Sequence, residues 1–378
     1  MRSQHGLTRR RRAPSKRDKG GASRGRRSLA LRAGRQRSGT SALKLLTGPD
    51  LDEPGRAHGY FRLPISTDAS AYGSILIPAV TYRNGDGPRV LVVAGNHGDE
   101  YEGQILIRKL IRTLELDDVS GQITLLPAAN APAVQAGRRV SPLDQGNLNR
   151  LFPGHPNGTP TQMIAHLLET VLLPGFDFVL DLHSGGRSLE YLPSTVIVRP
   201  DDPGQLEAQI ELLHVFGLPA SFVTDAPTGG GGSLAGACTR AGGIPCLSTE
   251  LGGGGGVSEQ ALAMARHGVL RLFRHLGVVR RDLSDQPPAK TSIYYRVPPS
   301  QFLYAPEAGI FEAYVKVGDR VEAGQAAGAI HRTDAPWEDA TVVKIQHDGI
   351  LLCRRFPART ECGDCLAVVG RQWPDAMA

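Results

Sequence analysis

Three side chains that can hold a metal ion follow two short apolar runs of the chain. His97 and Glu100 are three residues apart, so both lie on one face of a turn or a first helical turn, and His183 follows the second run. Catalytic zinc is commonly held by two histidines and a carboxylate, with the fourth position left for water. The pattern predicts one Zn²⁺ per subunit at these residues, with Asp181 as the hydrogen-bond partner of His183. The alternatives are another divalent ion, because selectivity depends on geometry and supply, and surface residues that bind no metal.

Glu250 follows a third apolar run and is the candidate general base and acid. Partial burial is expected to raise the pKa of its carboxyl group toward neutral pH. It would take a proton from a metal-activated water and later pass that proton to the leaving amine of an amide. The alternative role is structural, with Glu250 capping the glycine run at 252–256.

A loop bounded by Gly146 and Gly154 contains Asn149 and Arg150. An arginine beside an asparagine in such a loop suits bidentate recognition of a substrate carboxylate. Arg139 lies upstream, where it could join the anion site or polarise the scissile carbonyl. The alternative is that these arginines are simply solvated.

Buried strands and amphipathic helices must position these groups. Strand-like apolar runs span 74–80, 89–94, 123–126, 176–182 and 244–251, and helical patterns span 102–114, 161–173, 206–216 and 258–276. Strands that alternate with helices predict an α/β domain with a mostly parallel sheet. The candidate chemistry follows three of these strands, where open sheets leave a crevice for ligands.

The character of the chain changes near both ends. The polar segment 282–292 contains two prolines and is expected to be a linker, and short β-type runs fill 293–370. We predict a disordered basic extension at 1–45, a zinc hydrolase domain at 46–290 and an all-β domain at 291–378.

The net charge of +6 conceals two opposite regions. Residues 1–44 hold 15 of the 43 Lys and Arg residues and one acid, so this segment carries +14. The other 28 basic and 36 acidic residues give the rest of the chain −8, which argues against nucleic acid as a partner of the folded body. The basic segment lacks the apolar side chains that folding needs, and a polyanion-binding arm is the alternative interpretation.

Two further features bear on the location of the protein. No apolar run approaches the roughly 20 residues that span a bilayer, so no membrane association is expected. Five cysteines at irregular spacing indicate a reducing cytoplasm. Cys362 and Cys365 form a lone CxxC without the second pair of a zinc knuckle, so we interpret them as structural or accidental thiols.

Four strings resemble, in order, the succinylglutamate desuccinylase/aspartoacylase family of zinc acylases. They are GNHGDEYEG (95–103), NLNR (147–150), DLHSGG (181–186) and STELGG (248–253), and the resemblance covers about residues 60–370. It implies a three-layer, zinc carboxypeptidase-like domain with a mostly parallel mixed sheet, acting on a small N-acyl amino acid.

The resemblance also implies a role for each candidate residue. It assigns zinc to His97, Glu100 and His183, catalysis to Glu250, and substrate-carboxylate binding to Asn149 and Arg150. Arg139 matches a family arginine near the scissile carbonyl less closely, because about three extra residues around 141–143 separate it from NLNR.

Longer strings resemble one branch of this family. HGDEYEGQ, SPLDQGNLNRLFPG and DLHSGGRSLEYLP are similar to the branch that deacetylates N-alpha-acetyl-L-2,4-diaminobutyrate in ectoine breakdown. The alternatives are an acylase of the N-acetylaspartate or N-succinylglutamate type and a metallocarboxypeptidase that acts on peptides. A non-enzymatic metal-binding protein is disfavoured because the constellation is complete. A homo-oligomer remains open.

The C-terminal region at 305–330 resembles the biotinyl/lipoyl type of barrel-sandwich. A carrier domain needs a lysine on the hairpin tip that follows, but HRTDAPWED at 331–339 has none, so we reject a carrier role. The family resemblance implies instead that this domain lies over the mouth of the active site and helps to exclude longer substrates.

Overall fold

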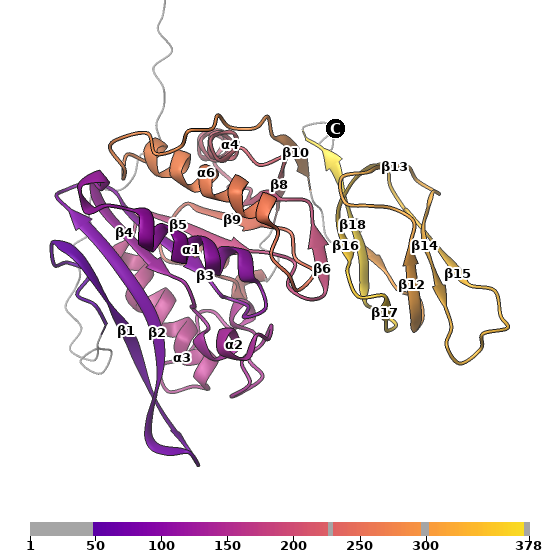
Figure 1. Ribbon diagram of the computed structural model, residues 1–378, viewed down its shortest axis with the longest axis horizontal. Coiled ribbons are helices and arrows are strands. Elements are labelled where there is room, and N and C mark those ends of the chain that lie inside the picture. The colour runs from indigo at the N-terminus through magenta and orange to yellow at the C-terminus, as the bar shows by residue number, and fades with distance from the viewer. Residues whose placement is uncertain (1–47, 226–229, 296–301, 374–378) are drawn as a thin grey trace, which may run out of the picture.

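The computed structural model describes residues 48–225, 230–295 and 302–373. The predicted basic extension at 1–45 lies outside the described residues. The described part is a mixed α/β fold built on one long sheet, with a smaller antiparallel sheet in the C-terminal region (Figure 1). This confirms the predicted α/β class with a large mixed sheet.

The long sheet has the strand order β1-β2-β4-β3-β5-β9-β7-β8-β10-β18-β16-β13. Its N-terminal strands are β1 (Gly55–Thr67), β2 (Ser70–Asn84), β3 (Arg89–Ala94), β4 (Gly121–Leu126), β5 (Phe178–His183), β7 (Ser194–Val198), β8 (Ala220–Thr224) and β9 (Cys246–Glu250). Strands β4, β3, β5 and β9 run parallel, whereas β7 runs antiparallel to β9 and parallel to β8. β3 is an almost continuous apolar run because neighbours cover both of its faces, whereas β5 carries Asp181 and His183 on one face.

Helices cover both faces of this sheet. One face packs against α1 (Tyr101–Thr113), α4 (Pro203–Phe216) and α6 (Glu259–His275), which lie together in Figure 1. The other face packs against α2 (Ala131–Ala136), α3 (Pro160–His166) and α5 (Leu234–Arg240). Short helical turns complete the connections: η2 (Leu116–Asp118), η3 (Leu148–Arg150), η4 (Leu167–Leu172), η5 (Leu173–Gly175) and η6 (Gly230–Gly232). A separate hydrophobic core lies on each face, so this part of the chain has three layers.

The C-terminal region is built from short antiparallel strands. β10 (Ser292–Tyr295), β13 (Arg320–Val321), β16 (Gly349–Arg355) and β18 (Cys365–Gln372) extend the long sheet, with β11 (Phe302–Tyr304) paired to β18 and β6 (Leu189–Tyr191) paired to β16. The smaller sheet has the order β15-β14-β12-β17, formed by β15 (Thr341–Lys344), β14 (Ala326–His331), β12 (Gly309–Ala313) and β17 (Arg359–Thr360). β10 pairs with both β8 and β18, so the long sheet is continuous across the predicted domain boundary.

Several elements match their predicted bounds closely. β3 spans the predicted 89–94, and α6 begins after Ser258, whose side chain accepts a hydrogen bond from the backbone of Ala261 as an N-cap does. The predicted helix at 161–173 is found in two parts, because α3 continues into the π-helical turn η4. Within the described ranges, no helix has the length and apolar character needed to cross a membrane.

Candidate active site

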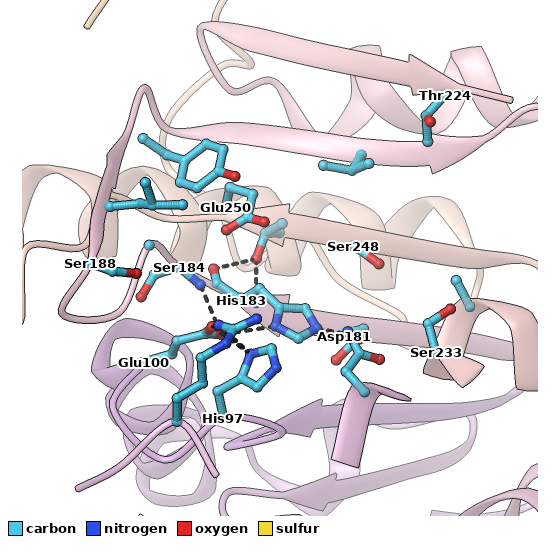
Figure 2. A pocket seen from close by; sticks show the side chains of 18 of the residues that line it. His97, Glu100, Asp181, His183, Ser184, Ser188, Thr224, Ser233, Ser248 and Glu250 are labelled. Atoms are coloured by element: carbon cyan, nitrogen blue, oxygen red, sulfur yellow. Dashed lines mark hydrogen bonds and ion pairs between the residues drawn. The ribbon is translucent and has the colours of Figure 1, made fainter. Parts of the chain in front are cut away.

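The candidate metal-binding and catalytic side chains lie at the ends of three neighbouring strands. The loop after β3 carries His97 and Glu100, β5 ends on His183, and β9 ends on Glu250. His183 and Glu250 are directly in register on parallel strands. Side chains in register project from the same face of a sheet, and both residues line one cavity (Figure 2).

His97, Glu100 and His183 form a compact buried cluster, with one donor atom of each within 4.8 Å of the others. Glu100 lies between the imidazoles: its Oε1 is 2.6 Å from Nδ1 of His97, and its Oε2 is 2.8 Å from Nδ1 of His183. Two histidines and one carboxylate are a donor set of catalytic zinc sites. The residues therefore fit a metal ion of this kind, and their role as ligands remains a prediction.

The outer nitrogen of each imidazole is held by a separate acceptor. Nε2 of His183 lies 2.9 Å from Oδ2 of Asp181, which confirms the predicted contact, and Nε2 of His97 lies 3.2 Å from Oδ1 of Asn147. An acceptor at Nε2 favours the tautomer in which Nδ1 carries no hydrogen, the form in which that nitrogen binds a metal. Both rings are thus oriented with Nδ1 toward Glu100.

The electrostatics of the cluster favour positive charge. Burial disfavours ionisation of Glu100, but the charges of His97 and His183 and their hydrogen bonds hold the pKa of its carboxyl well below its usual value. Burial also disfavours a charge on His183, yet the carboxylates of Asp181 and Glu100 raise its pKa well above its usual value. Two buried carboxylates therefore stabilise a cation at this position.

Two glycines allow close approach of the loop and of α1. A Cβ atom on Gly98 would lie 2.0 Å from the carbonyl oxygen of Ala133, and one on Gly103 would lie 2.6 Å from Cβ of Leu182. Only a residue without a side chain fits in these places. As a result α1 packs directly on β5, and the start of the helix reaches the end of that strand.

The cluster opens onto a cavity of about 330 Å³. Glu250 lines this cavity beside His183, where a general base would be needed. Arg139 also lines it and places Nη1 3.4 Å from Oε1 of Glu100. Ligand pockets commonly hold about 300–1,000 Å³, so this cavity has room for a small molecule.

The residues predicted to bind a carboxylate, Asn149 and Arg150, line another part of the same cavity. Oδ1 of Asn149 accepts a hydrogen bond of 2.9 Å from the backbone N–H of Leu234, which leaves the amide NH₂ group to donate. Arg150 donates 2.8 Å to the carbonyl oxygen of Asn149. Burial and the positive charge of Arg139 lower the pKa of Arg150, but arginine stays protonated at neutral pH. Two guanidinium groups that repel each other, beside an amide donor, favour an anion between them.

The structure gathers every residue predicted for the site around this cavity: His97, Glu100, Arg139, Asn149, Arg150, His183 and Glu250. Their individual roles remain predictions.

Other residues that contact the cluster or line the cavity were given no role by the sequence. Asn147, which contacts His97, is the first residue of the NLNR string, so the sequence pattern could have identified it as a site residue. Ser248 alternates with Glu250 along β9, and strand periodicity places both on one face. Phe302 and Cys365 come from the C-terminal region and reach the cavity only through the fold. Burial raises the pKa of the Cys365 thiol to about 11, so it is no nucleophile at neutral pH.

Comparisons with known proteins agree with this geometry. A model of the succinylglutamate desuccinylase/aspartoacylase catalytic domain matches residues 86–276. N-alpha-acetyl-L-2,4-diaminobutyric acid deacetylase of Halomonas elongata is 38% identical over 324 residues, which cover 85% of this chain and 93% of the relative. The product-bound ectoine utilization protein EutE (DoeB) of Ruegeria pomeroyi superposes with a TM-score of 0.82 at 34% identity, over 87% of this chain and 99% of that one. A succinylglutamate desuccinylase/aspartoacylase of Rhodobacter sphaeroides gives a TM-score of 0.80 at 36% identity, over 86% and 98% of the two chains.

Proposed function

Since the chain belongs to the succinylglutamate desuccinylase/aspartoacylase family, we propose that it deacetylates N-alpha-acetyl-L-2,4-diaminobutyrate to acetate and L-2,4-diaminobutyrate in ectoine breakdown. The family consists of hydrolytic acylases, and the chain is an amidohydrolase. The choice of substrate is supported by the name of the Halomonas relative and by that of the ectoine utilization protein. The observation that carries the proposal is the gathering of a His-Glu-His cluster, a further carboxylate and the Asn149–Arg150 pair around one small cavity.

We assign one zinc ion per subunit to His97, Glu100 and His183. The donor set and the held Nε2 atoms of both imidazoles support this assignment. A bound zinc ion supplies a Lewis acid, which lowers the pKa of water and polarises the amide carbonyl.

Glu250 moves the protons of the reaction. It takes one from the attacking water and delivers one to the nitrogen of the leaving amine, so that the amide bond breaks to a carboxylic acid and an amine. Its position in register with His183 supports this role, because the end of a rigid strand holds the carboxylate beside the cluster. Arg139 donates hydrogen bonds to the carbonyl oxygen as negative charge develops there.

Asn149 and Arg150 bind the carboxylate of the amino acid. Holding this group fixes the direction in which the acyl amide enters the cavity, and it selects free amino acids over internal positions of a peptide. The NH₂ group of Asn149 that the Leu234 contact leaves available supports this role.

The C-terminal residues 291–378 complete the proposal as a barrel-sandwich-like domain over the mouth of the site. Support comes from Phe302 and Cys365, which reach the cavity from β11 and β18. Their side chains limit the space for longer substrates.

A substrate panel with metal analysis tests the proposal. The zinc-loaded chain should release acetate from N-alpha-acetyl-L-2,4-diaminobutyrate faster than it cleaves succinyl, formyl or N-acetylaspartate substrates, with one zinc per chain. Release of C-terminal residues from dipeptides without cleavage of acetylated amino acids would refute the deacylase and indicate a carboxypeptidase.

A further inference from the structure

A second polar pair lies beside the reactive pair on the sheet. Asp181 is in register with Ser248, two residues before the register of His183 with Glu250. Both Asp181 and Ser248 line the cavity. Figure 2 shows them on one side of His183, whereas Ser188 lies on the other. The cavity therefore continues along the face of β5 and β9 past the metal cluster.

Asp181 has a carboxylate oxygen that the protein leaves unused. The residue is only 2% exposed, and its Oδ2 lies 2.9 Å from Nε2 of His183. Its Oδ1 is buried and has no hydrogen-bond partner within the described ranges. A buried acceptor without a donor is unfavourable, so a ligand that brings a donor to Oδ1 gains binding energy.

The other carboxylates that line the cavity in the described part of the chain, Glu100 and Glu250, already have contacts or a proposed role. Glu100 contacts both imidazoles and accepts from the backbone N–H of Ser184. Glu250 carries out proton transfer in the proposed function. Asp181 contacts His183 through Oδ2 alone, so its Oδ1, which has no partner within the described ranges, is available to the side chain of the substrate.

We propose that Asp181 and Ser248 form a subsite for a positively charged side chain of the acylated amino acid. The side-chain ammonium donates one hydrogen bond to Oδ1 of Asp181 and one to the hydroxyl of Ser248. This inference rests on the proposed function, because it places the reacting carbonyl at the level of His183 and Glu250. The subsite attracts amine side chains, because hydrogen bonds between an ammonium and a carboxylate are strong.

The spacing of the two pairs also selects the length of the side chain. Two residues along a strand span about 6.6 Å. Five bonds separate the scissile carbonyl carbon from the side-chain nitrogen of N-alpha-acetyl-2,4-diaminobutyrate, and at about 1.3 Å per bond an extended chain reaches about 6.5 Å. One methylene fewer reaches about 5 Å and two more reach about 9 Å. A side chain of two methylenes fits, whereas that of lysine is too long.

Binding of free amino acids to the zinc-loaded full chain tests the subsite without turnover. L-Norvaline matches L-2,4-diaminobutyrate in length and has a methyl group in place of the ammonium. Calorimetry of the wild type should show a preference for the diamino acid of about 30-fold or more, the range for a buried charge pair. Asp181→Asn should reduce this preference to a few-fold, and Ser248→Ala should reduce it by about threefold to tenfold. The matched control Ser188→Ala should leave it unchanged.

Metal content is measured for each variant, because Asp181 also contacts His183. Equal affinity of the wild type for both amino acids would overturn the subsite, and so would a full preference in Asp181→Asn with its zinc bound. If Asp181→Asn loses zinc, Ser248→Ala decides: a reduced preference supports the subsite and an unchanged one contradicts it. Hydrolysis of N-alpha-acetyl-L-2,4-diaminobutyrate and of N-acetyl-L-norvaline is followed in parallel. If neither compound is hydrolysed, the proposed function is refuted, while the binding preference still decides the subsite.

Discussion

Replacement of Glu250 by glutamine separates proton transfer from metal binding. The change keeps the size of the side chain and removes its ability to ionise. Glu250 lies in register with His183 but is not one of the three residues whose donor atoms converge. Zinc content should therefore stay at one ion per chain.

The expected loss of activity follows from two proton transfers by one carboxylate. General acid–base catalysis by one group contributes about 10²–10⁴-fold to a rate. Loss of both steps should lower kcat/KM by about 10³-fold or more, equivalent to about 4 kcal/mol of transition-state stabilisation. KM should change little, since Asn149, Arg150 and Asp181 still hold the substrate.

Acetate release and zinc content are measured on the same samples. Glu259→Gln is the matched control, because Glu259 is an exposed glutamate in the first turn of α6 that does not line the cavity. The control should keep the wild-type rate. A rate near that of the wild type in Glu250→Gln would refute proton transfer by Glu250, and loss of zinc would show that it holds the metal instead.

Three further predictions test the anion site, the loop that carries it and the packing of α1. Arg150→Lys keeps the charge but loses the paired donors, so KM should rise about 10- to 100-fold with a smaller change in kcat. The exposed Arg138→Lys is the control. An unchanged KM in Arg150→Lys, or an equal rise of KM in the control, would contradict carboxylate binding by Arg150. Burial raises the pKa of Asp144, but hydrogen bonds from Thr161 and its neighbours lower it, and the net pKa is below the usual value. The ionised form therefore stabilises the fold above the unfolded pKa of about 3.9, and this stabilisation is lost as pH falls through the lower folded value. Asp144→Asn should then cost about 1–2 kcal/mol at pH 7, and the difference from wild type should shrink below about pH 4 in thermal unfolding; a difference independent of pH would argue against the carboxylate. Gly103→Ala should lower the free energy of unfolding by about 1–3 kcal/mol in urea, because its Cβ would lie 2.6 Å from that of Leu182; wild-type stability would show that α1 can move away from β5 at no cost.

Local sequence patterns were sufficient to predict those elements whose structure depends mainly on their own residues. β3 and α6 could be predicted closely, because a continuous apolar run and an N-capping serine are local signals. The edge strand β1 was not predicted, although it forms a hairpin with β2, because its buried side chains alternate with exposed ones and make no continuous apolar run. The strands β7 and β8 were not predicted because β7 pairs with β9 and β8 with β10, which are distant in the sequence. β10 lies at the end of the predicted linker and becomes a strand only by pairing with β8 and β18. Such long-range pairing leaves little trace in a single sequence.

For the site, too, local patterns identify the residues and long-range pairing brings them together. The alternation of polar and apolar residues along β5 shows why. Leu180 and Leu182 contribute to the core that α1 and α6 cover, whereas Asp181 and His183 alternate with them and line the cavity. A carboxylate and an imidazole on one face of a buried strand indicate a polar site at that face, because polar groups are costly in an apolar core. The same alternation on β9 places Ser248 with Glu250. Strand periodicity could therefore identify both pairs, whereas only the fold shows that the pairs are side by side and in register. The second pair matters for function because its spacing from the first determines which side chain the enzyme accepts.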